Sequence, residues 1–313
     1  MTARPQAILR IGTRGSALAL AQANETRDRL LAAHPQLGAG AVEIVIVKTS
    51  GDRIQDRALR DAGGKGLFTK ELEEALSRGE IDIAVHSMKD VPTWLPPGLC
   101  IPCLLPREDP RDVLIARDAP SLDALPVGAI VGTASLRRQA QVLHRRPDVR
   151  IVTLRGNVET RLRKVAAGEV DATFLALAGL RRLGQAQRAT GIIEPSLMLP
   201  AVAQGAIGIE ARLDDAATHD RLRPLHHEAT GQCIAAERAM LAVLDGSCHT
   251  PIAGLAEIGA DGRLRLAAQV LKPDGSASIE TRREGAPADA EALGLDAGQE
   301  LKRRAGPGFF QAP

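Results

Sequence analysis

Long apolar runs are missing from this chain of 313 residues. No stretch reaches the roughly eighteen uninterrupted apolar residues that a membrane-spanning helix needs. The opening sequence MTARPQAILRIG also lacks the apolar core of a secretory signal. We therefore expect a protein with no membrane partner and with the cytoplasm as its location.

Aromatic side chains are scarce as well: they make up 2% of the chain, with one Trp, four Phe and no Tyr. Proteins that bind single-stranded nucleic acids stack the bases on such rings. The formal net charge is only +2, so the chain as a whole is not a polycation built for a phosphate backbone. Both observations disfavour a nucleic-acid partner.

The four cysteines are too few and too scattered for the disulfide framework of a small secreted domain. Cys100 and Cys103 form a C-x-x-C, but their apolar neighbours predict a buried strand at 99–105, in which positions three apart face opposite ways. This pattern disfavours a metal or redox pair there, and we expect no metal.

Strand-like and helix-like runs alternate through the first two thirds of the chain. This alternation predicts βαβ units and a largely parallel sheet in the first half, then a second α/β domain after the turn-rich segment 106–110. We expect strands at 8–11, 42–47, 81–85, 113–116, 129–131, 151–154 and 172–176, and helices at 16–33, at 69–78 and from Ser135 and Asn157. A helical run at 228–244 and strands at 264–271 and 277–282 then predict a small α+β domain.

Four segments place arginines at loops that open helices or follow strands. They are Arg14-Gly-Ser16, Thr133-Ala-Ser-Leu-Arg-Arg138, Arg155-Gly-Asn-Val-Glu-Thr-Arg161 and Arg181-Arg182. Helix N-termini and guanidinium groups both bind anions. Each segment alone is compatible with a capped helix or a solvated charge pair, but four on one topological side of open α/β sheets point to the crevice where such folds bind ligands. The implied ligand carries several carboxylates or phosphates.

Two further segments have both a functional and a structural interpretation. The Gly-rich loop 62–68 lacks the spacing of a P-loop, which disfavours ATP; Lys65 and Phe68 would lie either on a loop that covers the substrate or on an ordinary surface turn. The segment from His86 to Asp90 follows an apolar strand, and Asp90 is a candidate acid/base there. The same segment is also compatible with a plain hydrogen-bonded cluster.

Cys248 lies in the loop Gly-Ser-Cys-His-Thr-Pro, with His249 next to it. The turn context exposes the thiol, so Cys248 is a candidate nucleophile or attachment point. An inert loop cysteine is the alternative.

Read in order, these motifs resemble one family, hydroxymethylbilane synthase, also called porphobilinogen deaminase. The resemblance covers nearly the whole chain. It runs through RIGTRGSALAL at 10–20, GGKGLFTKELE at 63–73, DIAVHSMKDVP at 82–92, REDPRDV at 107–113, VGTASLRRQ at 131–139, LRGNVETRL at 154–162, ALAGLRRLG at 176–184, LPAVAQGAIGIE at 199–210 and the cysteine loop.

The resemblance implies an enzyme of tetrapyrrole biosynthesis. Such enzymes join four porphobilinogen molecules head to tail into hydroxymethylbilane and release ammonia from each. The family pattern implies a dipyrromethane cofactor attached through a thioether to Cys248, which serves as a primer and stays on the enzyme. It assigns Asp90 as the catalytic aspartate, which assists loss of ammonia, stabilises the azafulvene cation and helps remove the α-proton.

In this family every pyrrole of the growing chain carries an acetate and a propionate. The resemblance therefore implies that the arginines of the four segments bind these carboxylates. By motif matching, the residues implied for the cofactor are Cys248, Ser87, Lys89, Asp90, Thr133, Ser135, Arg137, Arg138, Arg155 and Gly156. Those implied for the substrate are Arg14, Ser16, Lys65, Phe68, Arg155, Arg161, Arg182 and Gln204.

The family fold implies three domains, two of them α/β domains like those of periplasmic binding proteins around a cleft, and a small α+β domain with the cofactor cysteine. We expect domain 1 at 1–105 and 204–224, domain 2 at 106–203 and domain 3 at 225–313, in a monomer. Two other classes remain as alternatives: a periplasmic-type solute-binding protein, which would need an export signal, and a thiol-dependent hydrolase using Cys248 with a histidine.

Overall fold

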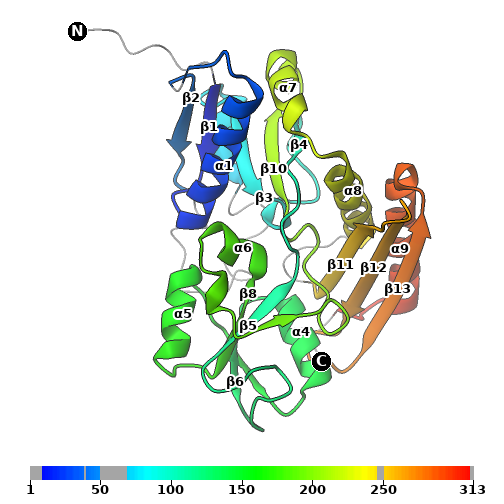
Figure 1. Cartoon of the computed structure of the whole chain (residues 1–313). Coiled ribbons are helices and arrows are strands. Elements are labelled where there is room, and N and C mark those ends of the chain that lie inside the picture. Colours follow the sequence, from blue (N-terminus) through cyan, green and yellow to red (C-terminus); the bar gives the residue numbers. More distant parts are fainter. Residues whose placement is uncertain (1–8, 39, 50–68, 245–249, 311–313) are drawn as a thin grey trace. The chain divides into compact units, whose positions relative to one another are not determined.

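The structure is a computed structural model that describes residues 9–38, 40–49, 69–244 and 250–310. The described residues form two compact units. One comprises those within 1–54, 66–107 and 206–231, and the other those within 108–205 and 232–313. Each unit is built on α/β elements (Figure 1).

The first unit contains a five-stranded sheet in the order β2-β1-β3-β10-β4. Its strands are β1 (Leu9–Thr13), β2 (Val42–Ile46), β3 (Ile83–Ser87), β4 (Leu99–Leu104) and β10 (Ile207–Arg212). The helices of this unit are α1 (Ala17–Ala33), α3 (Lys70–Ser77) and α7 (Ala216–Leu222).

Two apolar clusters cover the opposite faces of this sheet. Ile83 and Val85 of β3 pack with Leu30 of α1, whereas Ala84 packs with Leu76 of α3. This follows from the two-residue period of a strand, which sends neighbouring side chains to opposite faces. The burial of both faces explains why β3 reads as a continuous apolar run.

The prediction of a largely parallel sheet is wrong for this half of the chain. β1 is parallel to β2 and β3, but β10 runs antiparallel to both β3 and β4. The reason is that the chain comes back from the second unit and inserts β10 between two strands that are close in sequence. The sheet is therefore mixed.

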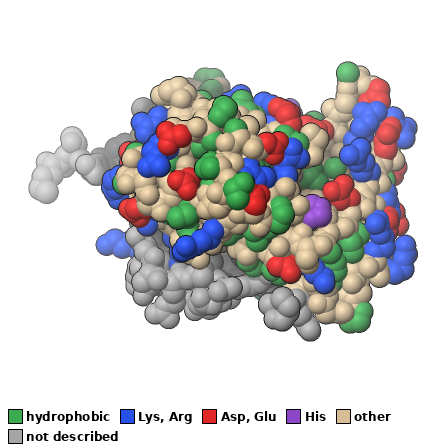
Figure 2. Space-filling model, turned by 90° about the horizontal axis from the view of Figure 1, so that it is seen from below, with side chains coloured by type: hydrophobic (Ala, Val, Ile, Leu, Met, Phe, Trp, Pro, Cys, Tyr) green, Lys and Arg blue, Asp and Glu red, His purple; other side chains and the backbone are tan. Residues whose placement is uncertain are grey.

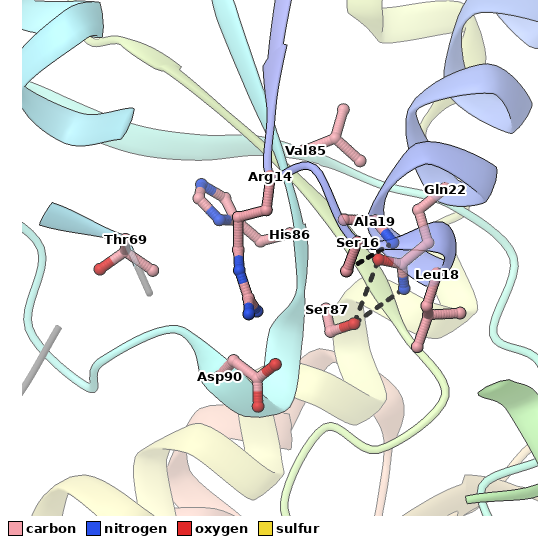
Figure 3. A pocket seen from close by; sticks show the side chains of 10 residues that line it. All are labelled: Arg14, Ser16, Leu18, Ala19, Gln22, Thr69, Val85, His86, Ser87 and Asp90. Atoms are coloured by element: carbon pink, nitrogen blue, oxygen red, sulfur yellow. Dashed lines mark hydrogen bonds between the residues drawn. The ribbon is translucent and has the colours of Figure 1, made fainter. Parts of the chain in front are cut away.

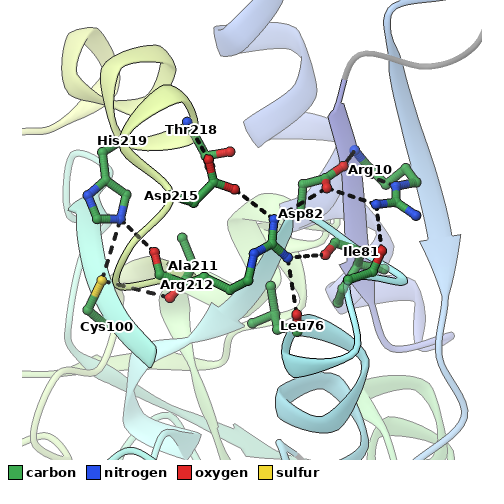
Figure 4. Close-up of polar contacts among 11 residues, drawn as sticks. Arg10, Leu76, Ile81, Asp82, Cys100, Ala211, Arg212, Asp215, Thr218 and His219 are labelled. Carbon is green, nitrogen blue, oxygen red and sulfur yellow. Dashed lines mark hydrogen bonds and ion pairs between the residues drawn. The ribbon is translucent and has the colours of Figure 1, made fainter. Parts of the chain in front are cut away.

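Arg212, at the end of this returning strand, holds it to the neighbouring segments (Figure 4). Its guanidinium donates to the carbonyls of Leu76 and Ile81 and to Asp215, while Asp82 pairs with Arg10.

In the same view, Cys100 lies 3.6 Å from Nε2 of His219. Cys100 belongs to β4 at 99–104, which confirms the predicted strand around the C-x-x-C.

The second unit contains a five-stranded sheet in the order β7-β6-β8-β5-β9. Its strands are β5 (Asp112–Ala116), β6 (Ile130–Gly132), β7 (Arg150–Val152), β8 (Ala172–Ala176) and β9 (Gly191–Ile193), and its helices are α4 (Leu136–Arg145), α5 (Val158–Ala166) and α6 (Leu177–Arg182). β6, β7 and β8 are parallel, whereas β5 runs antiparallel to β8 and β9. α4 and α5 pack on opposite faces, through Val142 and Leu162 respectively.

The same unit includes a three-stranded antiparallel sheet of β11 (Ile252–Ile258), β12 (Leu264–Leu271) and β13 (Ser278–Gly285), with α8 (Glu228–Val243) and α9 (Ala290–Ala305). Glycines let α8 and α9 approach closely: a Cβ on Gly294 would lie 2.1 Å from the carbonyl oxygen of Ala236. The predicted α/β class with a small α+β part at the C-terminal end is confirmed, although β11 was not predicted. The domain boundaries stay a prediction.

Basic and acidic side chains lie among one another on the face of the molecule in Figure 2. Several ion pairs of the described residues join exposed groups, such as Arg145 with Asp123. Among the described residues, no helix is both long and apolar enough to cross a membrane.

Candidate active site

A pocket opens at the edge of the first sheet where β1 and β3 end (Figure 3). The two strands are parallel neighbours, so the segments that follow Thr13 and Ser87 meet at one edge. The lining residues are Arg14, Ser16, Leu18, Ala19, Gln22, Thr69, Val85, His86, Ser87 and Asp90. The structure therefore brings together four of the residues proposed from the sequence: Arg14, Ser16, Ser87 and Asp90.

Arg14 and Asp90 approach this pocket from different strands. The guanidinium of Arg14 points toward the carboxylate of Asp90 in Figure 3. Asp90 and Lys89 are exposed, on the short 3-10 turn 88–90 that follows β3. A carboxylate exposed in this way is available to a substrate.

Ser16 begins α1, as predicted, and its side chain accepts a hydrogen bond from the backbone N–H of Ala19. One turn further along, Gln22 of α1 lies 3% exposed and donates from Nε2 to Oγ of Ser87 at 2.8 Å. Ser87 donates back to Oε1 of Gln22 at 3.2 Å. These two bonds fix the hydroxyl of Ser87 at the pocket wall.

His86, which lines the pocket, forms a buried pair with Glu210. Nε2 of His86 lies 2.9 Å from Oε2 of Glu210, and the two residues are 6% and 0% exposed. Burial, with a smaller contribution from the charge of Glu210, raises the pKa of Glu73 above its usual range. Two acids, Glu210 and Glu73, thus lie close enough to His86 on β3 to interact with one another electrostatically.

A second set of proposed residues lies in the second unit and centres on an aspartate. Asp112, the first residue of β5, is 0% exposed. Nη1 of Arg137 lies 2.7 Å from its Oδ2, and Nη2 of Arg138 lies 2.8 Å from its Oδ1. Burial raises the pKa of Asp112, but the two guanidinium groups outweigh it, so the pKa lies below its ordinary value.

Asp112 also accepts a hydrogen bond from Gln204, whose Nε2 lies 2.9 Å from Oδ1 and 2.7 Å from the carbonyl oxygen of Pro110. Two guanidinium groups against one carboxylate leave this buried cluster with a net positive charge. The Nε–H groups of Arg137 and Arg138 are buried and have no acceptor in the part of the chain that the structure describes. The cluster therefore has charge and donors suited to a further anion.

The remaining proposed residues of this unit follow β6 and β7 or lie on the helices α5 and α6. Thr133 accepts from the backbone N–H of Ser135, and Ser135 caps α4 as predicted. Arg161 of α5 donates to the carbonyl of Gly156 at 2.9 Å. Gly156 has φ of 120°, which only glycine adopts without strain, so the turn between Arg155 and the Asn157 cap requires it. Arg182, at the end of α6, donates to the carbonyl of Gly205 at 2.9 Å.

Three of the proposed residues, Lys65, Phe68 and Cys248, lie outside the described residues. In the described ranges, no group of three or more His, Cys, Asp or Glu side chains could hold a metal ion.

Sequence reasoning missed Gln22, Asp112 and Glu210. Asp112 and Glu210 sit inside the quoted motifs REDPRDV and LPAVAQGAIGIE, and Gln22 lies six residues after Ser16 on the inner face of α1. For Gln22 and Glu210 the available signal was a polar residue after an apolar stretch, which marks a buried group that needs a partner. Asp112 follows a charged segment and carries no such signal.

Comparison with known families decides the class of this site. Residues 9–220 match the family model described as "Porphobilinogen deaminase, dipyromethane cofactor binding domain", and residues 231–303 match "Porphobilinogen deaminase, C-terminal domain". The chain belongs to the porphobilinogen deaminase family. Porphobilinogen deaminase is hydroxymethylbilane synthase, a transferase of porphyrin biosynthesis.

Relatives in this family align over almost the whole chain. The porphobilinogen deaminase of Paracoccus denitrificans is 57% identical over 98% of this chain and 97% of its own length. That of Nitrobacter hamburgensis is 59% identical over 96% and 94%, and the chloroplastic enzyme of Oryza sativa is 57% identical over 97% and 86%.

Two solved structures with partial similarity are periplasmic binding proteins. A substrate-binding protein of an ABC transporter from Coxiella burnetii aligns with a TM-score of 0.43 and 14% identity over 74% of this chain and 96% of that chain. A TRAP solute-binding protein from Desulfovibrio salexigens aligns with a TM-score of 0.42 and 11% identity over 71% and 73%.

The second unit fits the dipyrromethane cofactor of this family. The pyrroles carry carboxylates, and the buried Asp112 cluster has a net positive charge with Nε–H donors to spare. α4 and α5 also begin at adjacent strand ends, where free backbone N–H groups favour anions. The guanidinium and backbone N–H donors of this unit therefore suit a group that carries carboxylates.

Proposed function

We propose that this enzyme joins four porphobilinogen molecules into hydroxymethylbilane on a dipyrromethane primer held by Cys248, with Asp90 as its catalytic residue. The observation that carries the proposal is the pocket at the ends of β1 and β3, where Asp90 faces Arg14. When bound, the dipyrromethane supplies the terminal pyrrole to which the first substrate is joined.

Asp90 would act on each incoming porphobilinogen at two points. As the aminomethyl C–N bond breaks, ammonia leaves with the bonding electrons, and the carboxylate stabilises the positive charge left on the pyrrole. After the new C–C bond has formed, the same carboxylate takes the α-proton. Its exposure and its position beyond β3 support both roles.

The cations would hold the acetate and propionate groups. In the first unit these are Arg14 and Lys89, with hydroxyls from Ser16 and Ser87, and Lys65 and Phe68 would contribute from their loop. In the second unit Arg155, Arg161 and Arg182 would bind substrate carboxylates, together with the amide of Gln204. Arg137, Arg138, Thr133, Ser135 and Gly156 would bind those of the cofactor. Guanidinium groups suit this task because they pair with carboxylates through two parallel hydrogen bonds.

Intact mass under denaturing conditions, before and after brief exposure to porphobilinogen, tests this proposal against a Cys248→Ser variant. We expect a covalent excess over the polypeptide mass that grows by equal pyrrole steps and is absent from the variant. A bare mass that also fails to grow after reconstitution with preformed hydroxymethylbilane would overturn the proposal. A solute-binding protein or a thiol hydrolase would give no colour with Ehrlich's aldehyde reagent, whereas a bound dipyrromethane would.

We further propose that the enzyme works as a monomer in the cytoplasm. The relative from Oryza sativa is named chloroplastic, so cell fractionation with an antibody to this chain is the direct test of location. Sedimentation of the purified holoenzyme tests the monomer: a mass well above 33.1 kDa would contradict it.

A further inference from the structure

The segment 199–205, which precedes β10, is contacted by side chains from two helices of the second unit. Helix α4 reaches it through Arg137, whose Nη1 donates to the carbonyl of Leu199 at 2.7 Å. α6 reaches it through Arg182, which donates to the carbonyl of Gly205. Gln204 then projects from the segment onto Asp112. Three residues proposed to bind carboxylates are therefore positioned by one short stretch of backbone.

Ala203 makes this stretch conformationally costly. Its φ is +61°, and it is the one non-glycine residue with positive φ in the described part of the chain. An alanine in the left-handed region suffers contacts of its Cβ that a glycine avoids. Such a conformation persists only where surrounding contacts hold it.

The contact that holds it comes from the C-terminal part of the chain. Oε2 of Glu237, in α8, accepts a hydrogen bond from the backbone N–H of Ala203 at 2.6 Å. Oε1 of the same carboxylate accepts from the backbone N–H of Ala256, in β11, at 2.7 Å. Glu237 is 0% exposed, so both bonds are shielded from water, where hydrogen bonds to a charged acceptor are strong.

A second bond ties the same two regions together: the N–H of Gly254 in β11 donates to the carbonyl of Pro200 at 3.1 Å. This bond acts outside the turn. Within the turn, the backbone N–H of Gln204 donates to the carbonyl of Ala201 at 2.9 Å, and the Glu237 bond adds a contact from α8 to Ala203 itself. The side chain of Gln204 follows directly, so a change of φ at Ala203 would move its amide away from Asp112.

We propose that Glu237 is a positioning residue, which holds Ala203 in its left-handed conformation and thereby places Gln204, Asp112 and the two arginines for carboxylate binding. The inference rests on the proposed function. Under this proposal α8, which precedes Cys248 in the sequence, contributes to carboxylate binding through the hydrogen bond from Ala203 to Glu237, in addition to its packing.

The test uses the holoenzyme with the substitutions Glu237→Gln and Ala203→Gly, singly and together. An amide has one acceptor oxygen, so Glu237→Gln places an NH₂ group against one of the two backbone N–H groups and breaks that bond. We expect the KM for porphobilinogen to rise on the order of tenfold with a much smaller change in kcat, because misplacement weakens carboxylate binding but leaves Asp90 in place. Glycine at 203 adopts the same φ without strain, so the double variant should recover most of the KM.

Two matched controls separate positioning from general stability. Ala201→Gly lies in the same segment but at an ordinary φ, so it should not rescue Glu237→Gln. Glu300→Gln, in α9, removes another hydrogen-bonded carboxylate of the same region, which contacts Thr281 and Arg283, and should leave KM within twofold.

The outcomes are distinct. If Glu237→Gln does not accumulate as folded protein, recovery of folding by Ala203→Gly and not by Ala201→Gly supports the proposal, and equal or no recovery overturns it. A normal KM in folded Glu237→Leu, whose side chain has no acceptor for either backbone N–H, also overturns it. Failure of the proposed function would look different, because the wild-type enzyme itself would then add no pyrrole mass.

Discussion

Arg138 and Asp112 form an ion pair of 2.8 Å in which the carboxylate is fully buried and the guanidinium is 7% exposed. Arg137 adds a second cation at 2.7 Å on the other carboxylate oxygen. The sequence predicts an anion-binding segment at Arg137 and Arg138, with a solvated charge pair as the alternative. The structure pairs both arginines in the interior with an aspartate from another strand. The single carboxylate of Asp112 compensates one of the two positive charges.

Asp112→Asn should destabilise the protein by about 3 kcal/mol at pH 7, because two buried guanidinium groups then lack their counter-charge. Urea unfolding followed by circular dichroism measures this loss. Asp123→Asn is the matched control: Asp123 pairs with Arg145 at the surface, where an ion pair contributes about 1 kcal/mol or less. Equal effects of the two substitutions would contradict the buried-pair interpretation.

The same variant has a pH signature. The folded-state pKa of Asp112 lies below its ordinary value of 3.8, so the stabilisation is present above that pH and is lost as the pH falls through the folded-state pKa. The difference in unfolding free energy between wild type and Asp112→Asn should therefore be constant from pH 5 to 7 and shrink in more acidic solution. A difference that grows toward acid would have the wrong sign.

Arg137→Ala should impair loading of the cofactor, measured as the covalent mass excess after incubation with preformed hydroxymethylbilane. Arg137 also donates to Leu199, so its loss disturbs the segment that carries Gln204. Arg145→Ala, on the same helix but exposed and paired with Asp123, should load normally. An Arg137→Ala enzyme that loads and elongates like wild type would remove this arginine from the binding set.

Asp90→Asn should keep substrate binding and lose about 10²- to 10⁴-fold in turnover, the range for removing a positioned acid/base. An amide keeps the shape of the carboxylate but neither stabilises a cation nor takes a proton. Single-turnover kinetics with mass detection separates the two effects. Asp118→Asn, at another exposed aspartate, is the control, and its turnover should match wild type. Near-normal turnover in Asp90→Asn would exclude the proposed role.

Local signals in the sequence predicted the elements that carry the site. The caps Ser16, Ser135 and Asn157 begin α1, α4 and α5, because a cap is decided by a side chain and an amide three residues away. The turn that carries Asp90 also follows its strand as predicted, because the apolar run before it is a local signal for a buried strand.

What could not be predicted were contacts across long sequence distances. Asp112 meets Arg138 over 26 positions, and His86 meets Glu210 over 124. Nothing local in either segment distinguishes a buried partner from a solvated charge. The insertion of β10 between β3 and β4 is equally non-local, and it is the step that made the first sheet mixed.

Glu73→Gln should stabilise the protein at alkaline pH and not at acidic pH. Burial, with the neighbouring charge of Glu210, raises the pKa of Glu73 above its usual 4.5, while Thr69 and His86 oppose this shift and Glu74 adds to it. The folded state therefore holds the proton more tightly than the unfolded chain, so the wild type loses stability as the pH rises from 4.5 through the raised pKa. The variant cannot ionise and escapes that loss. Urea unfolding at pH 4.5, 6 and 8 should show the advantage of the variant growing with pH. An advantage of Glu73→Gln that stays constant over this range would mean that the carboxylate of Glu73 is not destabilised by its burial.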